Sequence, residues 1–202
     1  MMGNNMFLTG ENIYLRGLEY SDLDKGNYLE WLNDPEVCEF NSHHVHPYTR
    51  SMAEDYIKMV NSSDKHLVMA VVLSYTNEHI GNISLQGIHP IHRCAEYAVL
   101  MGEKRYWGKG YAKEASRLIV EHGFLALNLH RIHCGTTEEN IAMQKLADYM
   151  GMTKEGRRKE AVYKNGRFVD VLEYGVLRPD FFKKFGISDM AQSKQPAGLP
   201  AT

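Results

Sequence analysis

The strongest chemical signal in the sequence is a turn with two glycines, Arg105–Ala112, placed where a predicted strand ends and the longest predicted helix begins. The first N–H groups of a helix have no partner within it and lie at the positive end of its dipole, so they bind phosphate well. Gly108 and Gly110 lack side chains that would hold an anion away from these amides. The turn therefore predicts a phosphate-binding site.

Basic residues concentrate around this turn. Residues 102–117 hold five Lys or Arg against two Glu, a local charge of +3 in a chain whose formal net charge is −2. The spacing does not match a P-loop, because Gly110 follows Lys109 where that motif has Ser or Thr, nor a dinucleotide fingerprint, because Lys113 stands where Gly or Ala is required. A tight strand-to-helix turn without a ligand is the alternative, and the concentrated charge argues against it.

The segment Arg105–Ala112 resembles the Gln/Arg-x-x-Gly-x-Gly/Ala signature of the acetyl-CoA-dependent N-acetyltransferase (GNAT) superfamily, in its ribosomal-protein and spermidine acetyltransferase branch. The resemblance covers roughly residues 13–177 and implies acetyl-CoA as cosubstrate, with the loop amides holding its pyrophosphate. It also implies that the strand around Val99–Met101 separates from its neighbour and pairs with the pantetheine arm. The residues so assigned to the coenzyme are Val99, Leu100, Met101, Arg105, Tyr106, Trp107, Gly108, Lys109, Gly110, Tyr111, Ala112 and Asn140. For Asn140 a plain helix N-cap is the alternative.

Glu96 is the candidate catalytic residue. A lysine-like amine has a pKa near 10.4 in water, so acetyl transfer needs a base or a water relay to remove its proton. Glu96 begins the strand that leads to the loop, shares a face with Ala98 and Leu100, and occupies the position to which the resemblance assigns this role. The alternative is a solvated or ion-paired surface carboxylate.

The general acid implied by the resemblance is missing. Its Tyr would stand seven residues after Asn140, where this sequence has Ala147. Tyr149 is two positions further, a rotation of about 200° around a helix, and should point away from the thiol. Water or another side chain would then protonate the thiolate; otherwise the chain is an acyl-CoA-binding sensor or inactive relative without efficient transfer.

The acceptor side is less constrained. Residues 40–48 contain His43, His44 and His46, in a region that the resemblance assigns to the acceptor pocket. No metal is predicted, because two of these histidines are adjacent and no Cys or carboxylate joins them at ligand spacing. We expect direct transfer to a primary amine of a small-molecule or peptide acceptor: a protein N-terminus, a nucleotide-linked amino sugar, or a polyamine or other small amine. His89 and His92 could assist the base or be merely exposed.

The hydrophobic periodicity predicts the elements that position these residues. The expected strands are 13–16, 67–73, 81–86, 95–101, 130–136, 158–164 and 168–177, and the expected helices are 21–32, 51–60, 110–127 and 140–150. Asn165 and Gly166 mark a tight hairpin, and Gly151 marks a helix end. Ser21 with Asp24 predicts a capping box at the first helix. The order indicates an α/β (α+β) fold with a mixed, mostly antiparallel seven-stranded sheet and about four helices, the acyl-CoA N-acyltransferase fold.

Length and composition set the remaining expectations. A chain of 202 residues with 44% apolar and 24% charged residues is typical of one globular domain, here 1–185 followed by a tail at 186–202. The net charge of −2 argues against nucleic acid as a partner. Three widely spaced cysteines fit a reducing compartment, and the absence of a long apolar run argues against a membrane span. We therefore expect a cytoplasmic monomer or homodimer.

Overall fold

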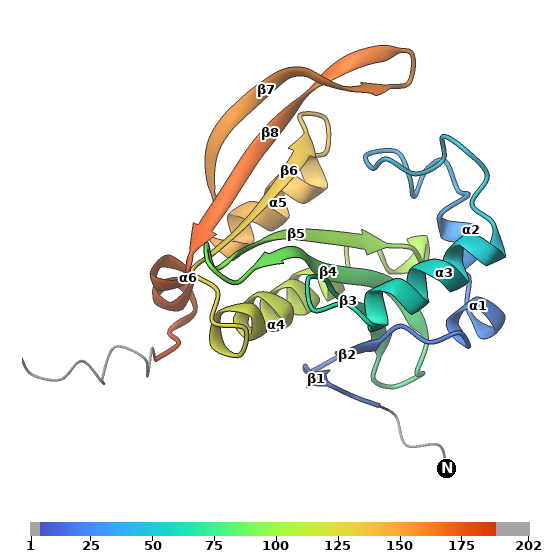
Figure 1. Cartoon of the computed structure of the whole chain (residues 1–202), viewed down its shortest axis with the longest axis horizontal. Coiled ribbons are helices and arrows are strands. Elements are labelled where there is room, and N and C mark those ends of the chain that lie inside the picture. Colours follow the sequence, from blue (N-terminus) through green and yellow to red (C-terminus); the bar gives the residue numbers. More distant parts are fainter. Residues whose placement is uncertain (1–4, 189–202) are drawn as a thin grey trace, which may run out of the picture.

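Eight strands form one mixed sheet in the computed structural model, which describes residues 5–188 (Figure 1). The strands are β1 (Leu8–Thr9), β2 (Ile13–Gly17), β3 (Leu67–Leu73), β4 (His79–His89), β5 (Cys94–Met101), β6 (Arg131–Thr137), β7 (Thr153–Lys164) and β8 (Arg167–Leu177). Their order across the sheet is β1-β2-β3-β4-β5-β6-β8-β7. All recorded pairs are antiparallel except β5 with β6.

Helices cover both faces of the sheet (Figure 1). They are α1 (Asp22–Lys25), α2 (Tyr28–Trp31), α3 (Arg50–Asn61), α4 (Tyr111–Leu125), α5 (Ile141–Met150) and α6 (Arg178–Phe185), with a 3-10 turn, η1 (Lys104–Tyr106), before α4. α4, α5 and α6 share one hydrophobic core with the sheet, and α1, α2 and α3 share a second core on the other face. The sheet therefore has an α4 face and an α3 face.

The continuous apolar run Leu67–Leu73 becomes β3 with the predicted bounds. Its side chains alternate between the two cores. Met69 and Val71 pack in the core of the α4 face, whereas Val68 and Ala70 pack in the core of the α3 face. A strand covered on both sides has no solvent-facing positions, and this explains why the sequence shows no polar alternation here.

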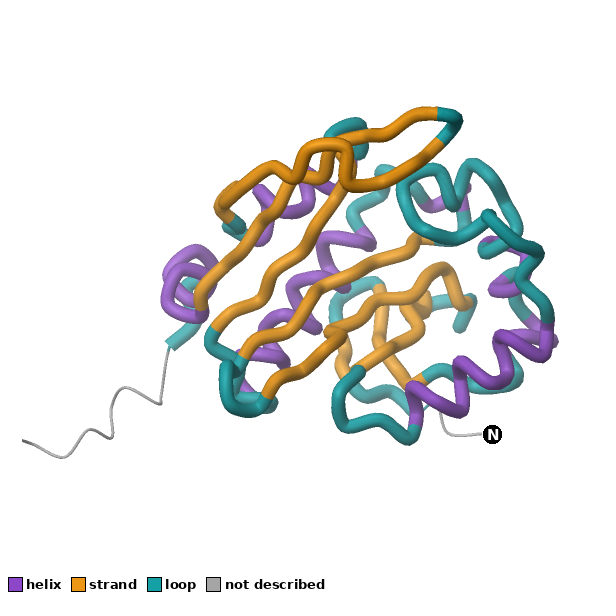
Figure 2. The backbone as a smooth tube through the Cα atoms, turned by 45° about the horizontal axis from the view of Figure 1, so that its top comes forward, coloured by secondary structure: helices purple, strands orange, loops and turns teal. Residues whose placement is uncertain are grey.

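Two tight ends that the sequence predicted are confirmed. Asn165 and Gly166 join β7 to β8 with φ values of 50° and 82°, the left-handed pair that a two-residue hairpin turn requires. Gly151 follows α5 with φ 78°, and its N–H donates to the carbonyls of Ala147 and Asp148. The far end of the β7–β8 hairpin, at Asn165 and Gly166, extends toward the loop between α2 and α3 (Figure 2).

The predicted element count was too low. The described residues form eight strands and six α-helices, where seven strands and about four helices were expected. The additional strand, β1, is only two residues long and gains its partner from β2. The additional C-terminal helix, α6, starts at Arg178 with a proline in its first turn and buries Phe181 and Phe182 in the core of the α4 face.

The single helix predicted from Ser21 to about Leu32 is wrong. The chain forms two four-residue helices, because Gly26 is extended (φ −118°, ψ 177°) and interrupts the helical path. Ser21 does not cap α1 through its side chain; its hydroxyl bonds the carboxylate of Glu19 at 3.1 Å. The break lets α2 turn back over the sheet, where the Trp31 indole lies against Gly102 so closely that a Cβ there would clash.

α3 begins at Arg50, one residue before the predicted start at 51. Its N-cap is Thr49, whose hydroxyl accepts a hydrogen bond from the Met52 N–H at 3.4 Å. Glu54 pairs with Arg50 at 2.8 Å.

None of the helices within residues 5–188 combines the length and apolar character that a membrane crossing requires. The tail expected from residue 186 lies outside the described residues from 189 onward.

Candidate active site

The two central parallel strands separate in the middle of the sheet. β5 and β6 pair at three successive positions, the last being Glu96 beside His133. Beyond that pair β5 continues to Met101 and β6 to Thr137, and no further pairing between them is recorded in the described chain. Figure 1 shows the two strands diverging. We call this opening the splay.

The backbone of β5 presents unused hydrogen-bonding groups to the splay. Bonding direction alternates along an antiparallel strand, and the Gly102 N–H donates to Ile80 O on the β4 side at 3.0 Å. Leu100 therefore also bonds toward β4, and Val99 and Met101 present their N–H and C=O groups to the opposite side. The Met101 carbonyl accepts the indole N–H of Trp107 at 2.7 Å. Val99 thus carries the backbone donor and acceptor that face the splay.

The two-glycine turn sits at the start of α4, beside this strand. Gly108 and Gly110 have φ values of 73° and 90°, in the left-handed region that favours glycine. Gly110 is the N-cap of α4, and within residues 5–188 no side-chain hydrogen bond caps the start of this helix. A Cβ on either glycine would meet no atom of the described chain within 4 Å. The amides of α4 therefore open onto free space.

The positive charge predicted around the turn is only partly directed at it. Arg105 forms an ion pair with Glu78, and Lys104 forms ion pairs with Asp34 and Glu36, both at 2.8 Å. Lys109 instead lies over the Tyr106 ring, with Nζ 5.1 Å from its centroid, and has no ion-pair partner among residues 5–188. Among the predicted coenzyme residues, Lys109 is the cation available at the turn.

Aromatic residues form the rest of the turn. The Tyr106 hydroxyl donates to Glu78 at 2.8 Å, and the Tyr111 and Tyr75 hydroxyls lie 3.3 Å apart. Ala112, in the first turn of α4, accepts the Ser116 hydroxyl at its carbonyl at 2.5 Å. These contacts fix the turn against the β3–β4 connection and the next turn of its own helix.

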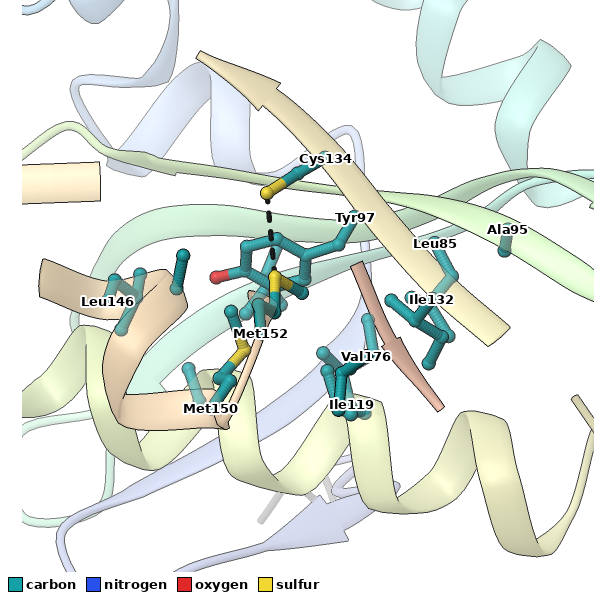
Figure 3. Close-up of a cluster of buried hydrophobic side chains, with 14 of the residues drawn as sticks. Leu85, Ala95, Tyr97, Ile119, Ile132, Cys134, Leu146, Met150, Met152 and Val176 are labelled. Carbon is teal, nitrogen blue, oxygen red and sulfur yellow. Dashed lines mark hydrogen bonds between the residues drawn. The ribbon is translucent and has the colours of Figure 1, made fainter. Parts of the chain in front are cut away.

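A packed cluster closes the α4 face below the splay (Figure 3). The Tyr97 hydroxyl bonds Ser116 at 2.6 Å, and the Cys134 thiol lies 3.6 Å from the Met152 sulfur. Since Ser116 gives its own proton to a backbone carbonyl, its oxygen accepts from Tyr97. Burial raises the pKa of Tyr97, and it raises the pKa of Cys134 to about 12. Both groups are therefore protonated at neutral pH.

Helix α5 carries the positions discussed for the general acid. Asn140 caps α5, and its side-chain oxygen accepts the Met143 N–H at 3.0 Å, as an ordinary N-cap does. Ala147 is fully buried in the core of the α4 face. The Tyr149 ring packs edge-on against Phe185, with centroids 5.6 Å apart, so it points toward α6. The Tyr149 ring thus packs between α5 and α6.

Glu96 lies on the other side of the sheet from the α4 helix. Its neighbour Tyr97 is buried in the core of the α4 face. Leu100, four positions after Glu96 on the same strand, packs against the core of the α3 face. Because side chains alternate along a strand, Glu96 belongs to the α3 face. Its carboxylate is exposed, and it lies opposite Gln86 on β4.

The splay therefore connects two half-sites on opposite faces. The turn amides and Lys109 lie on the α4 side, and Glu96 lies on the α3 side. A thioester entering from the first side and an amine entering from the second would meet where β5 and β6 part.

Residues 40–48, which we call the histidine loop, border the α3 side. The His43 ring packs edge-on against Tyr48, with centroids 6.0 Å apart, and desolvation together with the charge of Lys164 lowers the pKa of His43. Lys164, at the end of β7, donates to the Cys38 carbonyl at 2.8 Å and to the Asn41 carbonyl at 2.9 Å. The hairpin is thereby fastened to the loop, closing an arch beside the Glu96 face.

Other histidines have local roles. His89 and His92 stack at the turn between β4 and β5, with ring centroids 4.1 Å apart. Across residues 5–188, no group of three or more His, Cys, Asp or Glu residues is arranged to hold a metal ion.

Sequence reasoning missed two residues of the α3 side, His133 and Lys164. The alternation of Arg131, His133 and Gly135 with buried Ile132 and Cys134 was the available signal for an outward-facing His133. Nothing in the sequence indicated that β6 would place it beside Glu96. Lys164 carried no signal, because its partners are backbone carbonyls more than a hundred residues away.

Comparisons with known proteins agree with this geometry. The profile of the Acetyltransferase (GNAT) domain matches residues 12–153. The N-acetyltransferase p20 of Bacillus licheniformis is 30% identical over 85% of this chain and 96% of its own length. The spermidine N(1)-acetyltransferase of Vibrio cholerae is 30% identical over 84% of this chain and 95% of its own length. A crystal structure of spermidine N-acetyltransferase from Vibrio cholerae, in complex with CoA and spermine, superposes with a TM-score of 0.77 at 25% identity, covering 86% of this chain and 99% of that one.

Proposed function

The chain belongs to the acetyltransferase (GNAT) family, and on that premise we propose that it transfers acetyl from acetyl-CoA directly to the primary amine of a small-molecule acceptor. Membership makes it an acetyl-CoA-dependent N-acetyltransferase. The acceptor and the residue roles are the proposal. The observation that carries them is the splay, which joins an amide-lined half-site to a carboxylate half-site through one opening.

The coenzyme half-site holds the diphosphate and the pantetheine arm. The amides that begin α4, at Gly110 and Tyr111, bind the diphosphate oxygens, and Lys109 adds positive charge. The N–H and C=O of Val99 bind the amides of the arm as a strand would. Trp107 keeps the end of β5 in place by holding the Met101 carbonyl.

The reaction is a direct acyl transfer. The acceptor ammonium first gives one proton to Glu96, directly or through one intervening group such as a water molecule. The neutral amine nitrogen then attacks the thioester carbonyl, an N–C bond forms, the C–S bond breaks and coenzyme A leaves as a thiolate. The nitrogen loses its second proton as the amide forms, which balances the proton that the thiolate takes up. The thiolate takes a proton from water, because Ala147 has no acidic group and Tyr149 is packed toward α6.

Small amines are the proposed acceptor class. Relatives of this chain include spermidine acetyltransferases, one of them 30% identical over most of both chains. The hydrogen bonds of Lys164 tie the β7–β8 hairpin to the loop that follows α2, and a short, flexible amine needs less room beside this contact than a folded protein does.

The test is product analysis after incubation with acetyl-CoA and a mixed amine panel. The panel contains polyamines, other small amines, a peptide with a free N-terminus and a nucleotide-linked amino sugar. We expect thiol release above background and a mass increase of one acetyl group on a small amine, with Glu96→Gln protein as the matched control. Binding of acetyl-CoA without thiol release for any amine would contradict the proposal, and preferential acetylation of the peptide or the sugar would contradict the acceptor class.

A further inference from the structure

We propose that His133 is a second catalytic residue, which accepts the proton of the attacking amine beside Glu96; this inference rests on the proposed function. Glu96 and His133 are partners in the last recorded pair of β5 and β6 before the strands separate. Neighbouring strands lie about 4.8 Å apart, and paired residues point to the same face, so carboxylate and imidazole are within reach of one another and of the splay.

The charges around His133 leave Glu96 as its available partner. From β7, Glu155 is held by Arg131 of β6, with Nη1 to Oε1 at 2.6 Å. From β8, Glu173 is held by Arg158 of β7 at 2.5 Å.

Glu96 itself has no hydrogen bond or ion pair to another residue in the described part of the chain, and neither does the His133 ring. The arginine on β6 holds the pKa of Glu155 below its ordinary value, and the charge of His133 contributes to that lowering. The His133 imidazole is therefore near Glu155, but Glu155 is held by Arg131, whereas no arginine of the described chain pairs with Glu96.

Exposure also distinguishes the pair. His133 is half-buried and Glu96 is exposed, so the imidazole lies deeper along the face and the carboxylate lies at its rim. Gln86, across from Glu96 on β4, is turned to Ser84, to which its amide donates at 2.9 Å. The amide is thus occupied, and the side of Glu96 toward β6 is where a partner can act.

The chemistry favours an imidazole here. Protonated amines have pKa values near 10, free carboxylic acids near 4 and histidine near 6.5. Imidazole lies between the other two, so it accepts a proton from an amine more readily than a carboxylate does. The ammonium proton passes to the imidazole nitrogen before the N–C bond forms, and the imidazolium passes it on to Glu96. The proton then leaves to solvent from the exposed carboxylate side, and no additional reactant is needed.

The test compares His133→Gln with His130→Gln across pH, using the acceptor identified in the panel. His130 is exposed and immediately precedes β6, so it is a control histidine close in the sequence but outside the paired strand. We expect H133Q to lower kcat/KM by about 100-fold at pH 7. The loss should shrink toward pH 10, where the amine is already neutral, with unchanged affinity for coenzyme A and an unchanged unfolding midpoint. H130Q should match the wild type.

Four results would overturn the inference. The first is H133Q activity within threefold of the wild type at pH 7. The second is a loss that is equal at every pH. If H133Q fails to fold, His133→Ala with added imidazole decides: restored turnover supports the proposal, and no restoration overturns it. A wild-type protein that acetylates no amine would overturn the proposed function and this inference together, whereas active wild-type and H130Q proteins with an equally active H133Q would remove His133 alone.

Discussion

Replacing Gly110 by Asp and, separately, by Asn isolates the electrostatic part of coenzyme binding. Both side chains have nearly the same shape and both occupy the left-handed region more readily than most residues, so the strain from φ 90° is shared. Nothing in the described chain lies within 4 Å of the added Cβ, so neither variant should clash internally. The Asp and Asn variants therefore differ chiefly by one negative charge placed against the diphosphate.

The size of that difference follows from Coulomb's law. Two like charges about 4 Å apart repel by about 1 kcal/mol in water and about 4 kcal/mol at an effective dielectric constant of about 20. Gly110→Asp should therefore bind coenzyme A roughly 5-fold to 1000-fold more weakly than Gly110→Asn. Because salt screens exposed charges, the ratio should fall as ionic strength rises.

The assay is isothermal titration with coenzyme A at two salt concentrations. Gly166 is the control position, because it also has positive φ and open space around its Cβ, but lies in the hairpin turn of β7 and β8. Gly166→Asp and Gly166→Asn should bind coenzyme A equally. Equal affinity of the two Gly110 variants would refute the assignment of the diphosphate to this turn.

Three further perturbations test other parts of the account. Glu96→Gln should lower kcat by about 100-fold while leaving coenzyme A affinity unchanged; equal activity would remove Glu96 from the site. Lys164→Met removes both bonds to the loop carbonyls and should raise the acceptor KM several-fold and speed amide exchange in residues 38–43, whereas exposed Lys159→Met should do neither; unchanged exchange would argue against the arch. Burial alone would raise the pKa of Asp22, but the hydrogen bonds and charge of Arg16, the charge of His79 and the Glu19 N–H together outweigh burial and lower it. The stabilisation from ionised Asp22 is therefore present above the ordinary carboxyl pKa and is lost as the pH falls through the lower folded value. Asp22→Asn should lower the free energy of unfolding by about 3 kcal/mol at pH 7 and make it depend less on pH in acid. An unchanged pH dependence in acid would contradict this.

Local sequence signals predicted the elements whose cause is itself local. The apolar run of β3, the Asn165–Gly166 hairpin and Gly151 after α5 each depend on neighbouring residues, and the structure places them as expected. The elements that were wrong depend on distant partners. β1 is stabilised by pairing with β2 and by Leu8 packing against the core of the α4 face, and the break at Gly26 accompanies the packing of α2 back onto the sheet.

The same distinction applies to the candidate site. The two-glycine turn and Glu96 can be found from spacing and resemblance, because each lies within one short segment. His133 lies 37 positions after Glu96 in the numbering (133 − 96) and becomes its neighbour only through the parallel pairing of β5 with β6. The local charge count likewise could not predict that Arg105 pairs with Glu78, because Glu78 lies in the connection between β3 and β4.

A crystal structure with bound coenzyme A is the most direct test of the central claim. The account predicts that the diphosphate lies on the amides from Gly108 to Ala112 and that the pantetheine arm passes between β5 and β6, bonded to Val99, with its sulfur directed at the Glu96–His133 pair. A diphosphate bound elsewhere, or an arm that leaves the splay empty, would contradict it.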